Sequence, residues 1–168
     1  MISKVGLDEY CATHIGQCSW MIFRCHSKTD ENIMIHHDTL ETRLIDFGSA
    51  TQTDSETIHS EIYGTKKFAC PESLRDSSYS PLAQESWALG ALLYILCFQV
   101  DPFASTDEVF TVNMNSRLLR SQSIAKFKGY NYCPKMLAVI QKCMSMNPAQ
   151  RYSLVDLEQI FLKEKWLP

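Results

Sequence analysis

The residues of this chain that could do chemistry lie in short motifs, and the most informative is Asp46-Phe47-Gly48 at the end of the short apolar stretch 43–45. Asp46 carries hard carboxylate oxygens, and Asn32, fourteen residues upstream, carries an amide oxygen. By itself the triplet also fits a turn that ends a strand, because Asp and Gly both favour turns. The spacing between Asn32 and Asp46 fits a hairpin between the two residues.

Six other short motifs flank this triplet in order along the chain. They are Asp30-Glu31-Asn32-Ile33, Gly64-Thr65, Cys70-Pro71-Glu72, Trp87-Ala88-Leu89-Gly90, Asp101-Pro102-Phe103 and Asn147-Pro148-Ala149-Gln150-Arg151. Any one of these short matches recurs by chance, but an ordered series is specific. The series therefore indicates one known arrangement of motifs.

With these motifs in order, the chain resembles the C-terminal lobe of a protein Ser/Thr kinase, closest to the PIM and PAS kinase branch of the calcium/calmodulin-kinase-like group. Residues 30–35 and 43–50 are similar to that branch's D-E-N-I-L-I and L-I-D-F-G-S-A, and residues 85–94 to its D-x-W-S-L-G-x-L-L-Y. No G-x-G-x-x-G loop, V-A-I-K lysine or other N-lobe motif occurs in the chain. The resemblance implies a family that transfers the γ-phosphoryl group of ATP to Ser or Thr of proteins.

The apolar pattern predicts a mainly helical chain, and the resemblance makes residues 1–168 a partial kinase domain: a C-lobe helical bundle with one small hairpin that carries the Asp-Phe-Gly motif. We expect a first long helix over 7–28, then a hairpin over 33–45 with strands 33–36 and 42–45. An activation segment follows over 46–72, with an exposed polar loop at 49–63, and a short helix begins after Pro71. A buried central helix is expected over 81–98, and the remaining helices within 106–163 at 106–114, 135–145 and 153–163, the last capped by Ser153.

The resemblance also assigns a nucleotide and a metal. It implies that Asn32 and Asp46 hold Mg²⁺ and that Met34, Ile45 and Asp46 bind ATP, with Met34 and Ile45 forming the floor under the adenine. If no nucleotide binds, Met34 and Ile45 are plain core residues, and the sequence leaves both interpretations open.

Other roles follow from the same resemblance. Glu31 is similar to the acidic residue that meets a basic substrate side chain, and Glu72 and Arg151 are similar to a buried ion pair at the end of the activation segment. Glu85 stands where the family has an Asp that holds the catalytic loop, and Trp87 is a structural core residue.

The chain departs from the family at the catalytic base. Without gaps, Ser27 occupies the position of the aspartate that takes the proton of the substrate hydroxyl. A second alignment matches 24–28 to the end of the preceding helix, so that Lys28-Thr29 runs directly into Asp30 and the whole catalytic loop is deleted. On either alignment no catalytic residue is intact.

Composition bounds the function further. The chain has 168 residues and a net charge of −3, and this charge argues against a nucleic-acid partner. Its seven cysteines form no C-x-x-C pair, which argues against structural zinc. Abundant unpaired cysteine suits a reducing compartment. No secretory signal or span is apparent, so we expect no membrane partner and a location in the cytoplasm, with the nucleus as the alternative. Three hypotheses remain: a kinase acting on a protein substrate, an inactive pseudokinase-like scaffold for a protein partner, and a non-functional fragment or isoform. The oligomeric state is left open.

Overall fold

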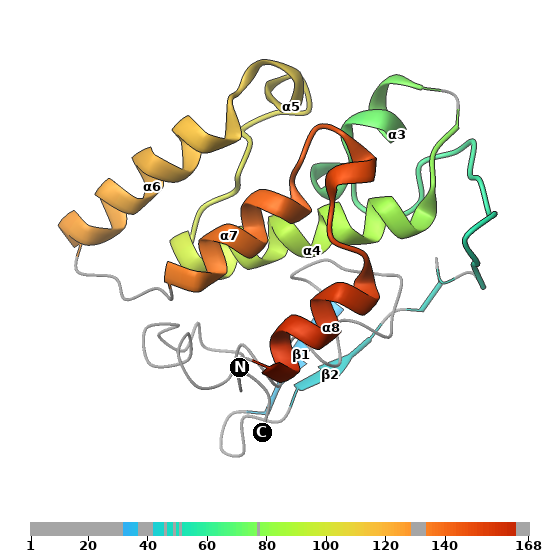
Figure 1. The fold of residues 1–168 in the computed structure, drawn as a ribbon, viewed down its shortest axis with the longest axis horizontal. Coiled ribbons are helices and arrows are strands. Elements are labelled where there is room, and N and C mark those ends of the chain that lie inside the picture. Colours follow the sequence, from blue (N-terminus) through green and yellow to red (C-terminus); the bar gives the residue numbers. More distant parts are fainter. Residues whose placement is uncertain are drawn as a thin grey trace.

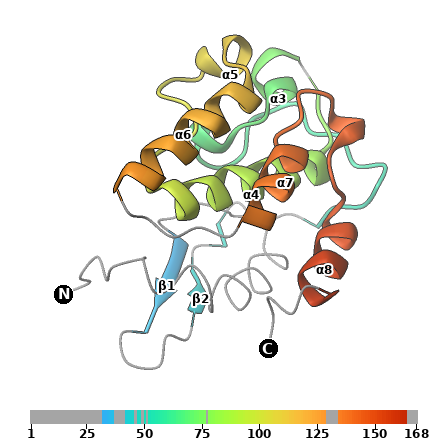
Figure 2. The ribbon, with the colours of Figure 1, turned by 60° about the vertical axis from the view of Figure 1, so that its left-hand side comes forward.

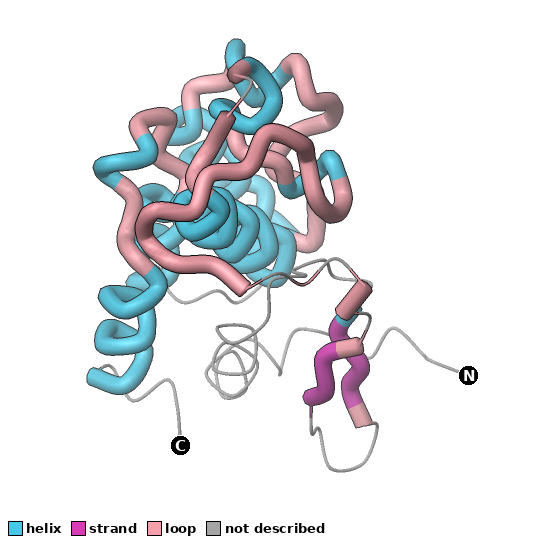
Figure 3. The backbone as a smooth tube through the Cα atoms, turned by 90° about the vertical axis from the view of Figure 1, so that its right-hand side faces the viewer, coloured by secondary structure: helices cyan, strands magenta, loops and turns pink. Residues whose placement is uncertain are grey.

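The computed structural model describes residues 32–36, 42–45, 47–48, 50, 52–76, 78–128 and 134–163. In chain order the elements are strands β1 (Ile33–Ile35) and β2 (Thr42–Leu44), the 3₁₀ turn η2 (Lys66–Phe68), helices α3 (Pro71–Arg75), α4 (Pro81–Phe98), α5 (Glu108–Thr111), α6 (Met114–Lys128) and α7 (Pro134–Cys143), the 3₁₀ turn η3 (Pro148–Gln150), and helix α8 (Leu154–Lys163). The described part is a helical body with one hairpin at its side, as Figure 1 and Figure 3 show.

Helix α4 forms the centre of this body. Pro81 stands in its first turn, where a missing N–H costs nothing, and Gln99 ends it in the left-handed region with φ 56° while its N–H donates to the Ile95 carbonyl at 2.7 Å. By length and composition α4 could cross a membrane, the one such helix among the residues described, but 72% of that window is buried inside the protein. The helix is therefore the core of the fold.

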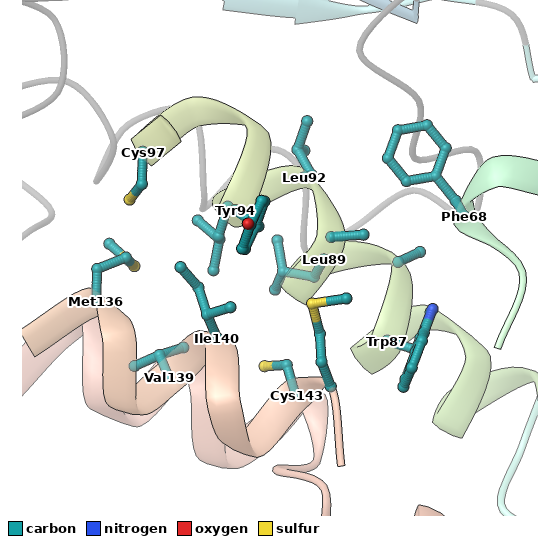
Figure 4. Close-up of a cluster of buried hydrophobic side chains, with 14 of the residues drawn as sticks. Phe68, Trp87, Leu89, Leu92, Tyr94, Cys97, Met136, Val139, Ile140 and Cys143 are labelled. Carbon is teal, nitrogen blue, oxygen red and sulfur yellow. The ribbon is translucent and has the colours of Figure 1, made fainter. Parts of the chain in front are cut away.

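Helix α7 packs along α4 and supplies the other half of the core. Figure 4 shows Leu89 and Tyr94 of α4 facing Met136 and Ile140 of α7, and these four side chains are at most 1% exposed. Helices α6 and α8 also contact α4, so α6, α7 and α8 are arranged around it (Figure 2).

The two strands pair antiparallel in the register Ile33↔Leu44, Met34↔Arg43 and Ile35↔Thr42. The Ile45 N–H continues the ladder by donating to the Asn32 carbonyl at 2.9 Å. Ile33 packs against the helical core, so the hairpin is attached to the body through β1.

Several predicted elements agree with these bounds. The hairpin, the short helix at Pro71, the helix over 81–98 and the last helix are present within one or two residues of the predicted limits. The Ser153 Oγ accepts from the Asp156 N–H at 3.1 Å, as a cap should, while the Ser153 N–H donates back to the Asp156 carboxylate at 3.0 Å. The helix predicted over 7–28 lies outside the described residues.

The prediction was wrong between 106 and 128. The helix expected over 106–114 is only the four residues of α5, and the fifteen-residue helix α6 that follows was not foreseen. Its buried residues are Leu118, Ser121 and Ala125, two of them small, so the buried face has almost no apolar signal in the sequence.

Candidate functional site

The ion pair of Glu72 and Arg151 lies at the junction of α3, α4 and the turn η3. The Arg151 Nη1 donates to Glu72 Oε1 at 2.5 Å, and the Arg151 Nη2 donates to Glu72 Oε2 at 2.7 Å. The Arg151 side chain is 1% exposed and the Glu72 side chain 12%. This two-pronged geometry is the strongest form of carboxylate recognition that an arginine makes.

The rest of the Arg151 guanidinium is also occupied. Its Nε donates to the Ser145 carbonyl at 2.8 Å, its Nη1 donates also to the Ala83 carbonyl at 3.1 Å, and its plane lies 5.0 Å from the centre of the Trp87 ring. A buried charge is tolerated only when it is paired and hydrogen-bonded in this way. Arg151 thus joins the end of α7, the start of α4 and the start of α3.

The environment of Glu72 keeps its carboxyl ionised. Burial alone would raise the pKa of this carboxyl, but the hydrogen bond and the positive charge of Arg151 outweigh burial and hold the pKa below its ordinary value. The group therefore remains a carboxylate, which is the state that the two-pronged contact requires.

Gln84 on α4 fixes the segment that leads into α3. Its Oε1 accepts from the Cys70 N–H at 2.8 Å and from the Ser73 Oγ at 3.2 Å, and its Nε2 donates to the Phe68 carbonyl at 2.8 Å. The Cys70 side chain beside it is fully buried, and burial raises the pKa of its thiol to about 11. Cys70 is therefore a packing residue and not a reactive thiol.

The two structural residues predicted on α4 are buried as expected. Trp87 is 1% exposed, and its ring stacks on that of Phe103 with centroids 6.0 Å apart. Glu85 is also buried, although its carboxylate has no role that the described residues explain. The Ser86 Oγ between them donates to the Tyr152 carbonyl at 2.8 Å, which ties α4 to the segment before α8.

The predicted nucleotide residues on the hairpin share one face. Met34 lies opposite Arg43, and Ile45 is two residues beyond Arg43, so the side chains of Met34 and Ile45 point to the same side. They are 39% and 42% exposed, so neither is a core residue in this structure. The exposed Arg43 lies on the same face, and Phe47, beyond the hairpin, is exposed as well.

The remaining predicted site residues, Ser27, Glu31 and Asp46, lie outside the described residues. Among those described, no group of three or more His, Cys, Asp or Glu side chains is placed to hold a metal ion. The structure therefore brings together Asn32, Met34 and Ile45 on one hairpin and Glu72 with Arg151 at the helical base.

The described part of the predicted activation segment is mostly exposed, yet two contacts attach it to the helical body. His59 and Tyr79 exchange backbone hydrogen bonds of 2.9 Å, and the Tyr79 hydroxyl donates to the Glu61 carbonyl at 2.9 Å. Further on, Lys67 lies 3.7 Å from Asp101 of the Asp-Pro-Phe motif. These contacts define the path of the segment before it enters α3.

Sequence reasoning missed Gln84 and Ser145. Gln84 lies within the helix predicted over 81–98, but no contact was predicted for it, and Ser145 contributes through its backbone carbonyl, which any residue could supply. A signal for Gln84 is its place among the polar residues 84–86, which precede the apolar run of α4.

Comparison of the sequence with known proteins identifies similar kinases. The family model described as "Protein kinase domain" matches residues 28–167. A PAS domain-containing serine/threonine-protein kinase of Mus musculus is 31% identical over 115 residues, which is 67% of this chain and 8% of the relative. The serine/threonine-protein kinase pim-2 of Danio rerio is 30% identical over 172 residues, which is 96% of this chain and 49% of the relative. The serine/threonine-protein kinase PSK2 of Saccharomyces cerevisiae is 28% identical over 82% of this chain and 11% of the relative.

The chain spans about half the length of the pim-2 relative and about a tenth of the other two. The matched range nevertheless includes every described element of the fold, with the ion pair of Glu72 and Arg151 inside it. The chain belongs to the protein kinase family, as a relative of the Ser/Thr kinases.

Proposed function

We propose that this chain forms the C-terminal lobe of a Ser/Thr kinase of the PIM and PAS branch, and that residues 1–168 do not transfer a phosphoryl group on their own. The observation that carries the proposal is a contrast within one chain. The helical base keeps its ion pair of Glu72 and Arg151 with full hydrogen bonding, whereas no H-R-D triplet precedes Asn32.

The missing triplet removes a chemical step. Phosphoryl transfer needs a group that takes or orients the proton of the substrate hydroxyl, and an aspartate does so in this family. Ser27 cannot replace it, because a hydroxyl is not a base near neutral pH.

The described residues fit the apolar part of a nucleotide site. Met34 and Ile45 are two exposed apolar side chains on one face of the hairpin, which suits contact with the underside of an adenine ring. Asn32 and Asp46 would hold Mg²⁺, which neutralises the charge of the β- and γ-phosphates when bound. Glu31 would favour a basic protein substrate in a complete enzyme of this type.

The second candidate is a protein-binding scaffold without catalysis. The exposed apolar side chains of Met34, Ile45 and Phe47 favour it, because uncovered apolar side chains near one another mark a surface that another molecule covers. A non-functional fragment is the third candidate, and it differs from the other two in having no cooperative unfolding transition.

Two measurements on the purified chain test the proposal. In the first, transfer of labelled γ-phosphate from Mg·ATP to basic Ser peptides is compared for the chain, an Asp46→Asn variant and the pim-2 relative as the active control. We expect signal from the relative alone. Transfer by the chain that the Asp46→Asn change abolishes would refute the proposal.

In the second, thermal unfolding is recorded with and without Mg·ATP. A ligand present at one hundred times its Kd stabilises the folded state by about 2.7 kcal/mol, which is readily seen as a rise in Tm. A rise in the chain that is lost in Asp46→Asn would favour the C-lobe with a nucleotide site. A cooperative but unshifted transition would favour the scaffold, and a transition without cooperativity would favour the fragment.

A further inference from the structure

Helix α6 leaves three of its large apolar residues exposed. Its buried face is made of Leu118, Ser121 and Ala125, whereas Leu119, Ile124 and Phe127 are 65%, 45% and 92% exposed. The helix lies at the edge of the body in both ribbon views (Figure 1 and Figure 2). A helix that contacts the core through one leucine and two small residues, and leaves a phenylalanine almost fully exposed, presents a surface for another molecule.

The exposed face continues into a cavity. Asn115, Leu119, Ser123 and Phe127 are spaced four residues apart, so they form one row along the helix. Asn115 at the start of this row also lines a cavity of about 380 Å³ between α6, the end of α7 and η3. The row and the cavity together form one continuous surface, and α6 alone gives it a length of about 22 Å.

The charges of this surface have one sign. The ionisable residues of α6 are Arg117, Arg120, Lys126 and Lys128, and the only ionisable residue among those that line the cavity is Lys142. Arg117 is paired with Glu108 of α5. The chain as a whole has a net charge of −3, so this concentration of positive charge is local and predicts a negatively charged partner.

We infer that the row and the cavity bind an acidic, amphipathic segment of a protein partner. Its apolar side chains would cover Leu119 and Phe127, and its carboxylates would meet Arg120 and Lys126. The cavity favours a peptide over an anionic lipid surface: its lining includes Met114, Met144 and Met146, which adapt to varied side chains, with Gln141 and Gln150 as polar partners for a backbone. This inference deepens the scaffold form of the proposed function by naming the class of partner.

The test is selection from a displayed library of random 16-residue peptides with the complete chain as bait, followed by fluorescence anisotropy of the enriched peptides. Phe127→Gln and Arg120→Gln alter the surface, and both side chains are exposed, so the fold should survive. Leu162→Gln and Lys163→Gln on α8 are the matched controls, since they change an exposed apolar and an exposed basic residue elsewhere.

We expect enriched peptides that are acidic with apolar residues three or four apart. We expect Phe127→Gln to weaken their binding at least about tenfold, as for a central aromatic anchor. Arg120→Gln and added salt should weaken it by a smaller factor, and the controls should not change it. No enrichment, basic peptides, or equal loss in the α8 controls would overturn the inference.

Vesicles containing phosphatidylserine distinguish the lipid alternative. Vesicle binding that requires Phe127 and Arg120, without peptide enrichment, would overturn the inference in favour of a membrane surface. None of these outcomes depends on ATP or phosphotransfer, so failure here leaves the tests of the kinase assignment unaffected.

Discussion

Gly90 of α4 and Cys143 of α7 lie so close together that no side chain fits between them. A Cβ atom added to Gly90 would lie 2.6 Å from the Cys143 Cβ and 2.7 Å from the Met144 Cγ. Glycine in the middle of a helix normally lowers stability, so its place here has a packing reason: it lets the two central helices approach each other.

We expect Gly90→Ala to destabilise the fold. The gain in helix propensity is about 1 kcal/mol, but forcing a methyl group into a packed core costs about 1–3 kcal/mol, and the fixed position of the Cys143 Cβ favours the upper part of that range. Urea denaturation measures the difference. Ser123→Ala on the exposed face of α6 is the control and should change the free energy of unfolding by less than about 0.5 kcal/mol. A more stable Gly90→Ala protein would contradict this account of the helix contact.

Breaking the ion pair of Glu72 and Arg151 should be costly. Glu72→Gln leaves the buried guanidinium without its counter-charge, and removal of one partner of a buried pair typically costs about 3–5 kcal/mol. Denaturant unfolding of Glu72→Gln, Arg151→Gln and the double variant gives the coupling between the two residues.

The pair of Lys67 and Asp101 is the matched control, since it is longer, at 3.7 Å, and both side chains are partly exposed. Asp101→Asn should change stability by no more than about 1 kcal/mol. An equal loss of stability on breaking the buried pair and the exposed pair would show that burial and two-pronged geometry do not determine the contribution of an ion pair here.

The same carboxylate predicts a dependence of stability on pH. The pKa of Glu72 is lower in the folded chain than its ordinary value of 4.5, so the folded state favours the ionised form. Its contribution is therefore present above the unfolded pKa, and it is lost as the pH falls from 4.5 through the folded pKa.

Unfolding free energies of the parent and Glu72→Gln between pH 7 and pH 3 measure this contribution. The gap between the two proteins should narrow below about pH 4.5. The comparison with the variant removes the contribution of Asp156, whose pKa is lowered by its hydrogen bonds with Ser153. A gap that is constant over this range would disprove the linkage.

Ser153→Ala should weaken the start of α8. The hydroxyl caps the helix by accepting from the Asp156 N–H, and loss of such a cap costs about 1 kcal/mol. Asp156→Asn tests the return hydrogen bond to the Ser153 N–H. The Tm of the parent should be higher than that of both variants. A Ser153→Ala protein as stable as the parent would show that the start of α8 contributes nothing to the cooperative fold.

Prediction from the sequence succeeded where local signals were strong. Pro81 and the apolar run from Trp87 to Phe98 predicted α4, and the turn residues 37–41, with the spacing of Asn32 and Asp46, predicted the hairpin. The pair of Glu72 and Arg151 was found only through the order of motifs, because the two residues are 79 positions apart and no local pattern links them.

The failures have physical causes as well. Helix α6 packs through one leucine and two small residues and exposes Leu119 and Phe127, so its apolar residues do not clearly mark the face that contacts the core. The two hypotheses for Met34 and Ile45 were nucleotide floor and plain core; both side chains are exposed in the described fold, and the nucleotide contact stays a prediction. The hydrogen bonds of Gln84 depend on groups of residues 68–73 that only folding brings close to it, and the sequence alone does not indicate these partners.

The contact between Glu72 and Arg151 also bears on how the chain folds. Because its partners are 79 positions apart in sequence and Arg151 also donates to the Ala83 carbonyl of α4, the contact closes a large loop and needs three separate segments of the chain to be in place. A contact that forms after the transition state acts on the unfolding rate more than on the folding rate. The ion pair would thus chiefly slow the unfolding of the lobe and so prolong the lifetime of its folded state.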